Sequence, residues 1–197
     1  MKQNSKIIGL TGGIATGKST VSRFLIEQNY PVVDCDKLAR IAVEPGRPAY
    51  IDIVDYFGAE ILLEDGSLNR KALGNIVFSD KRKLDKLNEI IHPRIRDLVL
   101  EKIEEYRLNG YEKIFVDAPL LFETGLNQLC DEVWLVSIPT ELQIERMVNR
   151  DNVSVDYAKS VIASQMSLEE KRKKSDKVIE NSKDLASLYK LVDELLK

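Results

Sequence analysis

Short apolar runs alternate along this chain with stretches in which apolar residues recur every three or four positions. Runs such as Ile114-Phe115-Val116 and Val133-Trp134-Leu135-Val136 are apolar at consecutive positions, a pattern typical of strands that are buried on both faces of a sheet. Strand patterns occur at Lys6–Thr11, Pro31–Asp34, Lys113–Asp117, Glu132–Ser137 and, most weakly, Lys177–Ile179. Because helical patterns separate these segments, we predict an α/β fold with a parallel sheet and crossover helices.

The long stretch from Ile51 to Tyr106 is predicted to be mainly helical, with a turn at Asp65-Gly66. Apolar residues recur at helical spacing in its second half, namely Leu84, Leu87, Ile91, Ile95, Leu98 and Ile103. Pro93 interrupts this repeat, so we expect one helix to end near His92 and another to begin with Pro93 in its first turn. A helical block between the second and third strands indicates an insertion that carries substrate specificity.

Two later segments, Thr140-x-x-Gln143 and Ser167-x-x-Glu170, have the spacing of a capping box, so we expect helices to begin there. The basic run Lys171–Lys174 is predicted to be an exposed helix end, where cations interact favourably with the helix dipole. A last helix has Leu185, Leu188, Leu191, Val192 and Leu195 on one face.

The composition is that of an ordinary globular protein and argues against several classes of function. The chain has 197 residues and a net charge of −3, with 29 basic and 32 acidic residues, which disfavours a non-specific nucleic-acid binder. No apolar run approaches the ~20 residues of a membrane helix, and Cys35 and Cys130 form no disulfide framework. We expect a single unit over residues 1–197 that works in the cytoplasm without membrane, nucleic-acid or obligate protein partners.

The strongest local signal is a complete phosphate-binding loop. Residues 12–20 match G-x-x-x-x-G-K-[ST] directly after a strand and before a helical pattern. Glycines let a backbone wrap closely around phosphate, and the N-terminus of the following helix attracts the anion. We expect Lys18 to reach the β- and γ-phosphates of a nucleotide and Ser19 to bind Mg²⁺. The predicted nucleotide-binding residues of the loop are Gly12, Gly13, Ala15, Thr16, Gly17, Lys18, Ser19 and Thr20. The alternative is a glycine-rich turn that merely opens a helix.

Carboxylates follow two predicted strands, at the edge where open α/β sheets bind ligands. In extended chain, Asp34 and Asp36 would face the same way. Asp36 is the better candidate for a base that accepts the proton of an attacking hydroxyl, although an aspartate that caps the next helix explains the pattern equally well. Asp117 ends the third strand, where it is either a simple strand end or a residue that supports Mg²⁺ through water.

Arg146 and Arg150 are four residues apart on one face of the helix predicted from Thr140. Paired guanidinium groups can clamp a phosphate during transfer, whereas a solvated face paired with acids such as Glu145 is the commoner explanation of helical arginines. His92 is the only histidine, and it is either a substrate contact or a helix-end residue. Because His92 has no metal-binding partners in the sequence pattern, a structural zinc site is excluded.

Taken in order, these motifs resemble the dephospho-CoA kinase family over nearly the whole chain. The shared segments are Ile8-Gly9-Leu10-Thr11-Gly12-Gly13-Ile14, Gly17-Lys18-Ser19-Thr20, Val33-Asp34-Cys35-Asp36, Ala39-Arg40, Val43-Glu44-Pro45-Gly46, Phe57-Gly58, Asp65-Gly66-Ser67-Leu68-Asn69-Arg70, His92-Pro93, Pro119-Leu120-Leu121-Phe122-Glu123, Gln165 and Asp176-x-Val178-Ile179-x-Asn181. The phosphate loop alone occurs in many kinases and other nucleotide hydrolases, but this order and spacing is far more specific.

The resemblance implies a P-loop kinase fold, with a five-stranded parallel sheet flanked by helices, a helical substrate-binding insertion and a helical lid. The nucleotide-binding core would comprise residues 1–50, 110–139 and 175–197, the insertion residues 51–109 and the lid residues 140–174. The implied activity is phosphorylation of the ribose 3′-hydroxyl of dephospho-CoA by ATP with Mg²⁺, the last step of coenzyme A biosynthesis.

At the level of residues, the resemblance assigns the catalytic base to Asp36 and places Arg146 and Arg150 in a lid that closes over the phosphates. It places an acceptor pocket at Arg70, His92, Leu120 and Glu123, and it places Asn181 near adenine. The chain departs from the family pattern at Ala15-Thr16, where Gly-Ser is usual, at Cys35, where alanine is usual, and at Ser182-Lys183, where a glycine often follows the asparagine.

A nucleoside or nucleoside-monophosphate kinase is the nearest alternative, because it would share the loop, the lid arginines and the base. The helical block and Pro119–Glu123 argue against it through the resemblance. A GTPase-type switch would need N-K-x-D for guanine recognition, and Asn181-Ser182-Lys183-Asp184 has the wrong spacing. A non-catalytic ATP-binding module would leave the carboxylate and the paired arginines unexplained.

Overall fold

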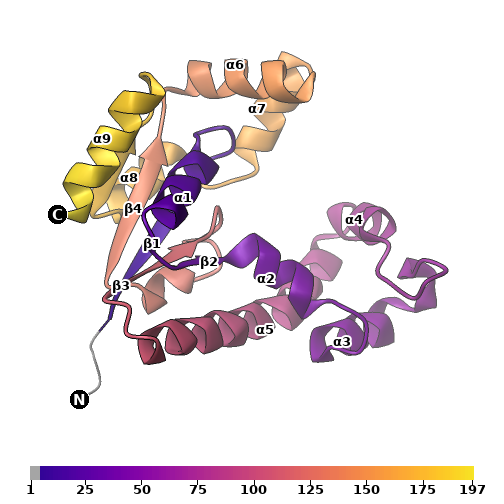
Figure 1. The fold of residues 1–197 in the computed structure, drawn as a ribbon. Coiled ribbons are helices and arrows are strands. Elements are labelled where there is room, and N and C mark those ends of the chain that lie inside the picture. Colours follow the sequence, from indigo (N-terminus) through magenta and orange to yellow (C-terminus); the bar gives the residue numbers. More distant parts are fainter. Residues whose placement is uncertain (1–4) are drawn as a thin grey trace. The chain divides into compact units, whose positions relative to one another are not determined.

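The computed structural model describes residues 5–197, whose contacts divide the chain into two compact units. One unit comprises the chain up to Val33 and again from Glu105 onward, and the other is Asp34–Glu104. The first unit contains a sheet with helices, and the second is built from helices (Figure 1).

A five-stranded sheet with the strand order β2-β3-β1-β4-β5 forms the centre of the first unit. Its strands are β1 (Lys6–Gly12), β2 (Val32–Asp34), β3 (Lys113–Asp117), β4 (Glu132–Ser137) and β5 (Lys177–Glu180). β1 pairs in parallel with β3 and β4, and β4 pairs in parallel with β5. The predicted parallel sheet is confirmed, and each strand end lies within one residue of its expected position.

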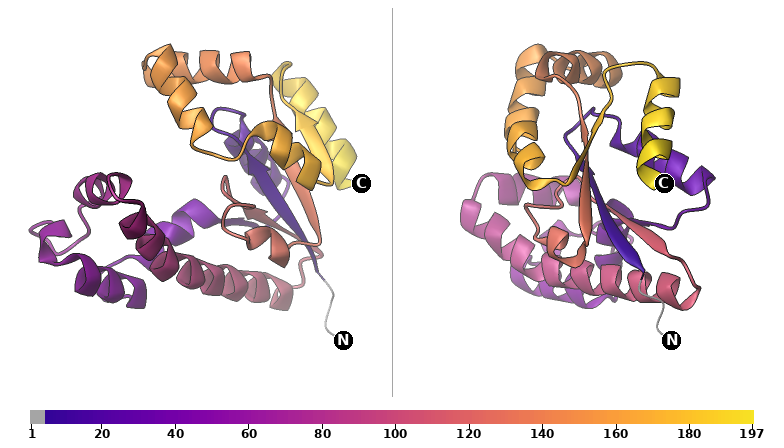
Figure 2. Two further views of the ribbon diagram at one scale, coloured as in Figure 1. Left: turned by 180° about the vertical axis from the view of Figure 1, so that it is seen from behind. Right: turned by 90° about the vertical axis from the view of Figure 1, so that its left-hand side faces the viewer.

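Helices lie on both faces of this sheet. The helices of the first unit are α1 (Lys18–Glu27), the end of α5 (Lys81–Leu108), α6 (Thr140–Asp151), α7 (Val155–Ala163), α8 (Leu168–Lys174) and α9 (Leu185–Leu196), together with the short 3₁₀-helix η2 (Leu126–Leu129). α1 and α9 lie together on one face, whereas α8 lies on the other (Figure 2).

Alternate strand side chains form a core with α1 and α9. Its buried members are Ile8, Leu10, Val21, Phe24, Leu25, Phe115, Trp134, Val136, Ile179, Leu188, Val192 and Leu196. On the opposite face, a Cβ at Gly9 would lie 2.7 Å from Leu121 Cδ2, so only glycine lets the segment after β3 pack this closely. Burial on both faces explains why the strands read as continuous apolar runs.

The second unit has an apolar core of its own. Its elements are α2 (Cys35–Ala42), α3 (Pro48–Phe57), the 3₁₀-helix η1 (Ala59–Ile61), α4 (Arg70–Phe78) and α5 up to Glu104. Buried residues such as Ala49, Ile53 and Ile61 contact an apolar stripe of α5 formed by Leu84, Leu87, Ile91, Ile95 and Leu98. The expected turn at Asp65-Gly66 is present, with Gly66 at φ 79°.

The predicted helix break at His92 and Pro93 is wrong. α5 is one helix of 28 residues with Pro93 inside it. An interior proline removes one helical hydrogen bond and costs about 3 kcal/mol. The apolar stripe packs on both sides of Pro93, from Leu84 to Leu98, and burial of such a side chain contributes about 1.5–3 kcal/mol. Continuous packing therefore outweighs the local penalty.

One predicted capping box is confirmed and the other is wrong. Ser167 accepts from the Glu170 N–H, and the Glu170 carboxylate accepts from the Ser167 N–H in return. At α6 the N-cap is Pro139 without a side-chain cap, and Thr140 is already helical. The Gln143 side chain is turned away from the helix end because it bonds to the phosphate-binding segment. A long-range partner has replaced the local one.

Among residues 5–197, no helix combines the length and the apolar composition that crossing a membrane requires.

Candidate active site

The phosphate-binding segment makes a tight turn between β1 and α1. Gly17, the residue before α1, has φ 88°, and a Cβ there would lie 2.1 Å from Asn181 Nδ2. Ala15 has φ 60°, in the left-handed region that residues with side chains rarely adopt. The Thr16 hydroxyl donates to the Gly13 carbonyl at 2.9 Å. The segment is therefore tightly wrapped, as in loops that bind anions through backbone N–H groups.

The first turn of α1 adds to this anion site. The helix begins at Lys18, so Ser19 and Thr20 lie at its positive N-terminal end. Thr20 N–H donates to the Gly17 carbonyl at 2.9 Å. The Ser19 side chain is exposed to solvent, which leaves its hydroxyl accessible to a ligand.

Lys18 forms an ion pair with Asp117 at the end of β3. Ser22 Oγ of α1 donates to the other carboxylate oxygen. The Lys18 side chain is 14% exposed and that of Asp117 is 9% exposed, so the pair is largely shielded from water. β1 and β3 are neighbours in the sheet, and Leu10 is paired with Asp117. Asp117 thus contacts the first residue of α1, directly after the loop, and is more than a strand end.

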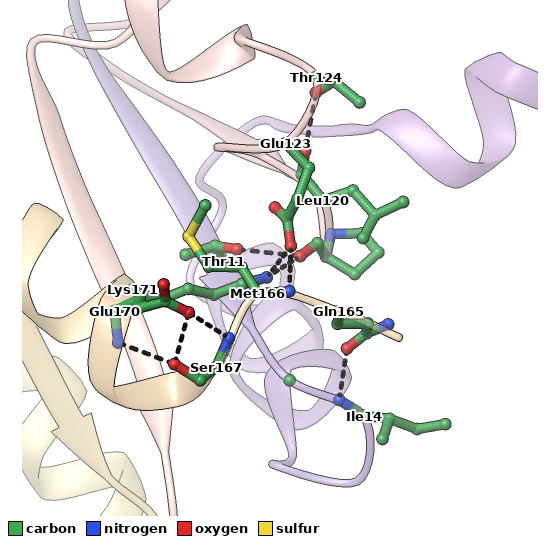
Figure 3. Close-up of polar contacts among 12 residues, drawn as sticks. Thr11, Ile14, Leu120, Glu123, Thr124, Gln165, Met166, Ser167, Glu170 and Lys171 are labelled. Carbon is green, nitrogen blue, oxygen red and sulfur yellow. Dashed lines mark hydrogen bonds and ion pairs between the residues drawn. The ribbon is translucent and has the colours of Figure 1, made fainter. Parts of the chain in front are cut away.

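Two glutamines hold the Ile14 peptide of the loop. Gln143 Nε2 of α6 donates to the Ile14 carbonyl at 2.7 Å, and the Ile14 N–H donates to Gln165 Oε1 at 3.3 Å. Gln143 is buried, and the contact of Gln165 is visible in Figure 3. Sequence reasoning quoted Gln165 only within a family motif and treated Gln143 as a cap, because no local pattern shows that both reach the loop.

Asn181 and Arg146 hold the other end of the loop. Asn181 Nδ2 donates to the Thr16 carbonyl at 2.8 Å, and the Asn181 carbonyl accepts from Arg146 Nη2 at 2.9 Å. Asn181 is 8% exposed. Its side chain therefore contacts the loop backbone, and the role near adenine that the resemblance implies stays a prediction.

Arg150 is engaged differently from Arg146. Its Nε and Nη2 donate to the two carboxylate oxygens of Asp151 at 2.7 and 2.8 Å. These hydrogen bonds raise the pKa of Arg150 and lower that of Asp151. Sequence reasoning expected an acid beside these arginines and named Glu145, whereas the partner is Asp151. Arg146 and Arg150 therefore have different partners in this structure.

The Asp34 and Asp36 geometry differs from the expected one. Asp34 is the N-cap of α2 and accepts from the Lys37 N–H at 2.9 Å, so the helix-capping explanation is correct for Asp34. The extended segment ends at Asp34, and Asp36 lies in the first turn of α2 with an exposed side chain. The extended geometry that would make Asp34 and Asp36 face the same way is therefore absent, because the helix begins between them. Cys35 between them is buried.

Lys171 is the functional candidate that sequence reasoning missed. The prediction that Lys171 lies on an exposed helix end is wrong, because its side chain is completely buried. Its Nζ donates to the Pro119 carbonyl at 2.5 Å and pairs with Glu123 at 3.0 Å (Figure 3). Burial lowers the pKa of Lys171, the Glu123 carboxylate opposes this change, and the positive charge of Lys18 adds to it.

The remaining predicted acceptor residues lie in separate local settings. In the first unit, Leu120 is 40% exposed. In the second unit, Arg70 is exposed at the start of α4, directly after the N-cap Asn69. His92 is half-buried within α5, and burial lowers its pKa.

The described residues 5–197 contain no group of three or more His, Cys, Asp or Glu side chains that could hold a metal ion alone. The Ser19 hydroxyl and the Asp117 carboxylate nevertheless fit Mg²⁺, which prefers oxygen ligands and usually shares its coordination with water and substrate phosphates. Asp117 is already paired with Lys18 beside the loop. These two oxygens are therefore the candidates for a magnesium site.

A cavity of about 440 Å³ opens beside the loop. Its wall includes Gly13 of the loop, Gln143 of α6, and Gln165 and Ser167 of the segment before α8. This volume lies in the range of small-molecule sites.

Comparison with known proteins covers almost the entire chain. A family model described as dephospho-CoA kinase matches residues 6–187. The dephospho-CoA kinase of Listeria monocytogenes is 47% identical over 187 residues, which cover 95% of this chain and 94% of that protein. The matched region includes the phosphate loop, the segment after β3 and helices α6 to α8.

Solved structures agree with these sequence matches. A crystal structure of a Thermus thermophilus protein has a TM-score of 0.85 at 34% identity, with 98% of this chain and 97% of that chain covered. The dephospho-CoA kinase of Campylobacter jejuni has a TM-score of 0.74 at 29% identity, with 96% and 94% covered. The matches therefore extend over both compact units.

Proposed function

The chain belongs to the dephospho-CoA kinase family, and we infer that it transfers the γ-phosphoryl group of ATP to the ribose 3′-hydroxyl of dephospho-CoA, giving coenzyme A and ADP. The observation that carries this inference is the family match over residues 6–187. The wrapped phosphate loop, Lys18 and the N-terminus of α1 support it, because they supply the local positive site that a chain of net charge −3 needs to bind a triphosphate.

The donor nucleotide would bind through its phosphates. We assign the β- and γ-phosphates to backbone N–H groups of the loop other than that of Ile14, which donates to Gln165, and to the N-terminus of α1. Lys18 would exchange the Asp117 carboxylate for phosphate oxygens and offset charge that develops during transfer. Ser19 and, through water, Asp117 would hold Mg²⁺, which neutralises phosphate charge when bound.

The acceptor side is proposed on the family resemblance. Asp36 would accept the proton of the attacking 3′-hydroxyl, and its exposed position in the first turn of α2 supports that role. Transfer would be direct, with no covalent enzyme intermediate. We propose that the second unit, which begins at Asp34 and includes the helical block from residue 51, contributes acceptor binding through Arg70 and His92.

Residues 140–174 would act as the lid. Arg146 contacts the loop neighbour Asn181, and Gln143 contacts the loop itself, so a movement of this region would change the phosphate site. Arg150 would have to leave Asp151 before it could bind a phosphate. Closure of such a region excludes water from the transferred group.

The expected setting is the cytoplasm, where the thiols of Cys35 and Cys130 stay reduced. Burial raises the pKa of Cys130 to about 12, so this thiol is unreactive at neutral pH. Dephospho-CoA is the proposed partner, and the expectation of no nucleic-acid, membrane or obligate protein partner stays a prediction.

The proposed reaction is tested by ADP formation with ATP and Mg²⁺, comparing dephospho-CoA with a panel of nucleosides and nucleoside monophosphates. Mass analysis and phosphorus NMR of the product would establish that the new phosphate is on the 3′-oxygen. A Lys18→Met variant is the control, because contaminating kinases would be unaffected by it. Turnover of a panel member in place of dephospho-CoA would contradict the proposed acceptor and favour the alternative of a nucleoside kinase.

A further inference from the structure

The ion pair of Lys171 and Glu123 joins α8 and the residues before it to the segment after β3, which is more distant in the sequence. Lys171 belongs to α8, Glu123 to the segment after β3, and Met166 to the segment before α8. Glu123 Oε1 accepts from the Met166 N–H at 3.1 Å and pairs with Lys171 Nζ at 3.0 Å (Figure 3). We call Glu123, Met166 and Lys171 the latch.

The burial of Lys171 shows that the residues of the latch are held in a defined arrangement. A fully buried ammonium group is costly unless it is paired and hydrogen-bonded. Lys171 is 0% exposed, and its partners are the Glu123 carboxylate and the Pro119 carbonyl. The Thr11 hydroxyl donates to the same Pro119 carbonyl at 3.3 Å, and Thr11 directly precedes the first glycine of the loop.

A second connection runs from the latch to the loop itself. Met166 follows Gln165, whose Oε1 accepts from the Ile14 N–H at 3.3 Å. By holding Met166, Glu123 fixes the position of the preceding residue, so the Gln165 contact depends on it. Glu123 itself is 23% exposed, and its carboxylate is occupied by two donors of this chain.

We propose that Glu123 and Lys171 are positioning residues that set the conformation of the phosphate loop through Gln165 and Ile14. Glu123 would then act on the nucleotide side of the reaction, in contrast to the acceptor-pocket role that the family resemblance implies. The proposal depends on the proposed nucleotide site for its kinetic consequence, but its structural consequence can be measured without any ligand.

The test uses the full-length variants Lys171→Met, Glu123→Gln and the double variant Glu123→Gln/Lys171→Met. Methionine keeps much of the lysine volume, and the double variant avoids a buried charge without a partner. The matched control is the Lys173–Glu169 pair of the same helix, whose side chains are 70% and 78% exposed. Control variants are Lys173→Met and Glu169→Gln.

The first readout is amide hydrogen exchange over residues 12–17 without nucleotide. We expect exchange at Ile14 to be roughly tenfold faster in the double variant and unchanged in the controls, because the Gln165 contact loosens. The second readout separates the substrates: the dissociation constant of ATP should rise roughly 5- to 20-fold, while the KM for dephospho-CoA at saturating ATP stays unchanged. The double variant should bind ATP no more weakly than Lys171→Met does.

Other outcomes overturn the proposal. Wild-type exchange at Ile14 in a folded double variant would show that the latch does not hold the loop. Increased KM for dephospho-CoA with unchanged ATP affinity would return Glu123 to the acceptor pocket. Weaker ATP binding in Lys171→Met but not in Glu123→Gln would make Lys171 a direct phosphate ligand. Failure of the wild-type protein to bind ATP would contradict the proposed function, while the exchange experiment would still decide on the latch.

Discussion

Asn181 Nδ2 occupies the space that a side chain at Gly17 would need, because a Cβ at residue 17 would lie 2.1 Å from that nitrogen. Asn181 is 164 residues away in the sequence, yet its amide closes one end of the phosphate loop through the Thr16 carbonyl. The loop is therefore shaped by the segment after β5 as well as by its own glycines.

The two left-handed positions of the loop should respond to substitution in opposite directions. Ala15→Gly removes the strain of a side chain at φ 60° but increases the entropy of the unfolded chain. The net effect should be to raise the free energy of unfolding by up to about 1 kcal/mol. Gly17→Ala introduces both a positive-φ side chain and the clash with Asn181, and it should lower that free energy by more than about 1 kcal/mol. Urea unfolding of both variants measures this, and equal effects would contradict the described loop.

The pair of Lys18 and Asp117 should matter through its charge. Asp117→Asn keeps the shape of the side chain and removes the charge, so we expect kcat/KM to fall at least roughly tenfold. Ser22→Ala removes only the hydroxyl that donates to the same carboxylate, so it should cost about 0.5–1.5 kcal/mol of stability with little loss of activity. Steady-state kinetics and thermal unfolding check both, and an equal loss of activity in the two variants would exclude a special role for the charge.

Substitutions of Asp36 and Asp34 should have different effects on turnover. Asp36→Asn should lower turnover roughly 10²-fold or more while ATP affinity is nearly unchanged, because asparagine cannot accept the proton of the acceptor. Asp34→Asn is the control, since asparagine is an equally good N-cap for α2 and should leave turnover near the wild-type value. Wild-type turnover in Asp36→Asn would remove that residue from the role of base.

His92 should make stability depend on pH near neutrality. Because burial lowers its pKa in the folded state, the unfolded chain binds more protons between the folded and unfolded pKa values, so stability rises with pH. Acidification from pH 7.5 to 5.5 should therefore lower the urea midpoint of the wild-type protein. Most of this decrease should occur as the pH falls below about 6.5, the pKa of histidine in the unfolded chain. In His92→Gln this drop should be smaller, and an identical drop would assign it to other groups.

The elements that sequence patterns predicted correctly are those whose signal lies within a short stretch of the chain. Ile114-Phe115-Val116 is apolar at every position because β3 is covered on both faces. The phosphate loop is one contiguous motif whose glycines act on their own backbone, so its location between β1 and α1 followed from the sequence. The Ser167 capping box likewise involves atoms three residues apart.

Three of the incorrect predictions concern residues whose partners are remote. The Gln143 side chain has the spacing of a cap but bonds to Ile14, 129 positions away. Lys171 lies in a basic run typical of an exposed helix end, yet it meets the Pro119 carbonyl 52 positions away. Pro93 would end an isolated helix, but the apolar stripe on both sides of it is held by the core of the second unit. Local propensity differs among such alternatives by a few kcal/mol or less, which the burial of several apolar side chains readily exceeds.

The strand order explains why these partners could not be inferred along the chain. β1 lies between β3 and β4, and β5 lies next to β4. The carboxyl ends of these four strands, which are distant in sequence, therefore lie together near the loop. Residue types and their spacing were enough to identify the chemistry of Lys18 and Ser19. The partners of Asp117, Asn181, Glu123 and Lys171 were decided by the packing of the sheet, because a pattern of neighbours along the chain contains no information about which segments a folded sheet brings into contact.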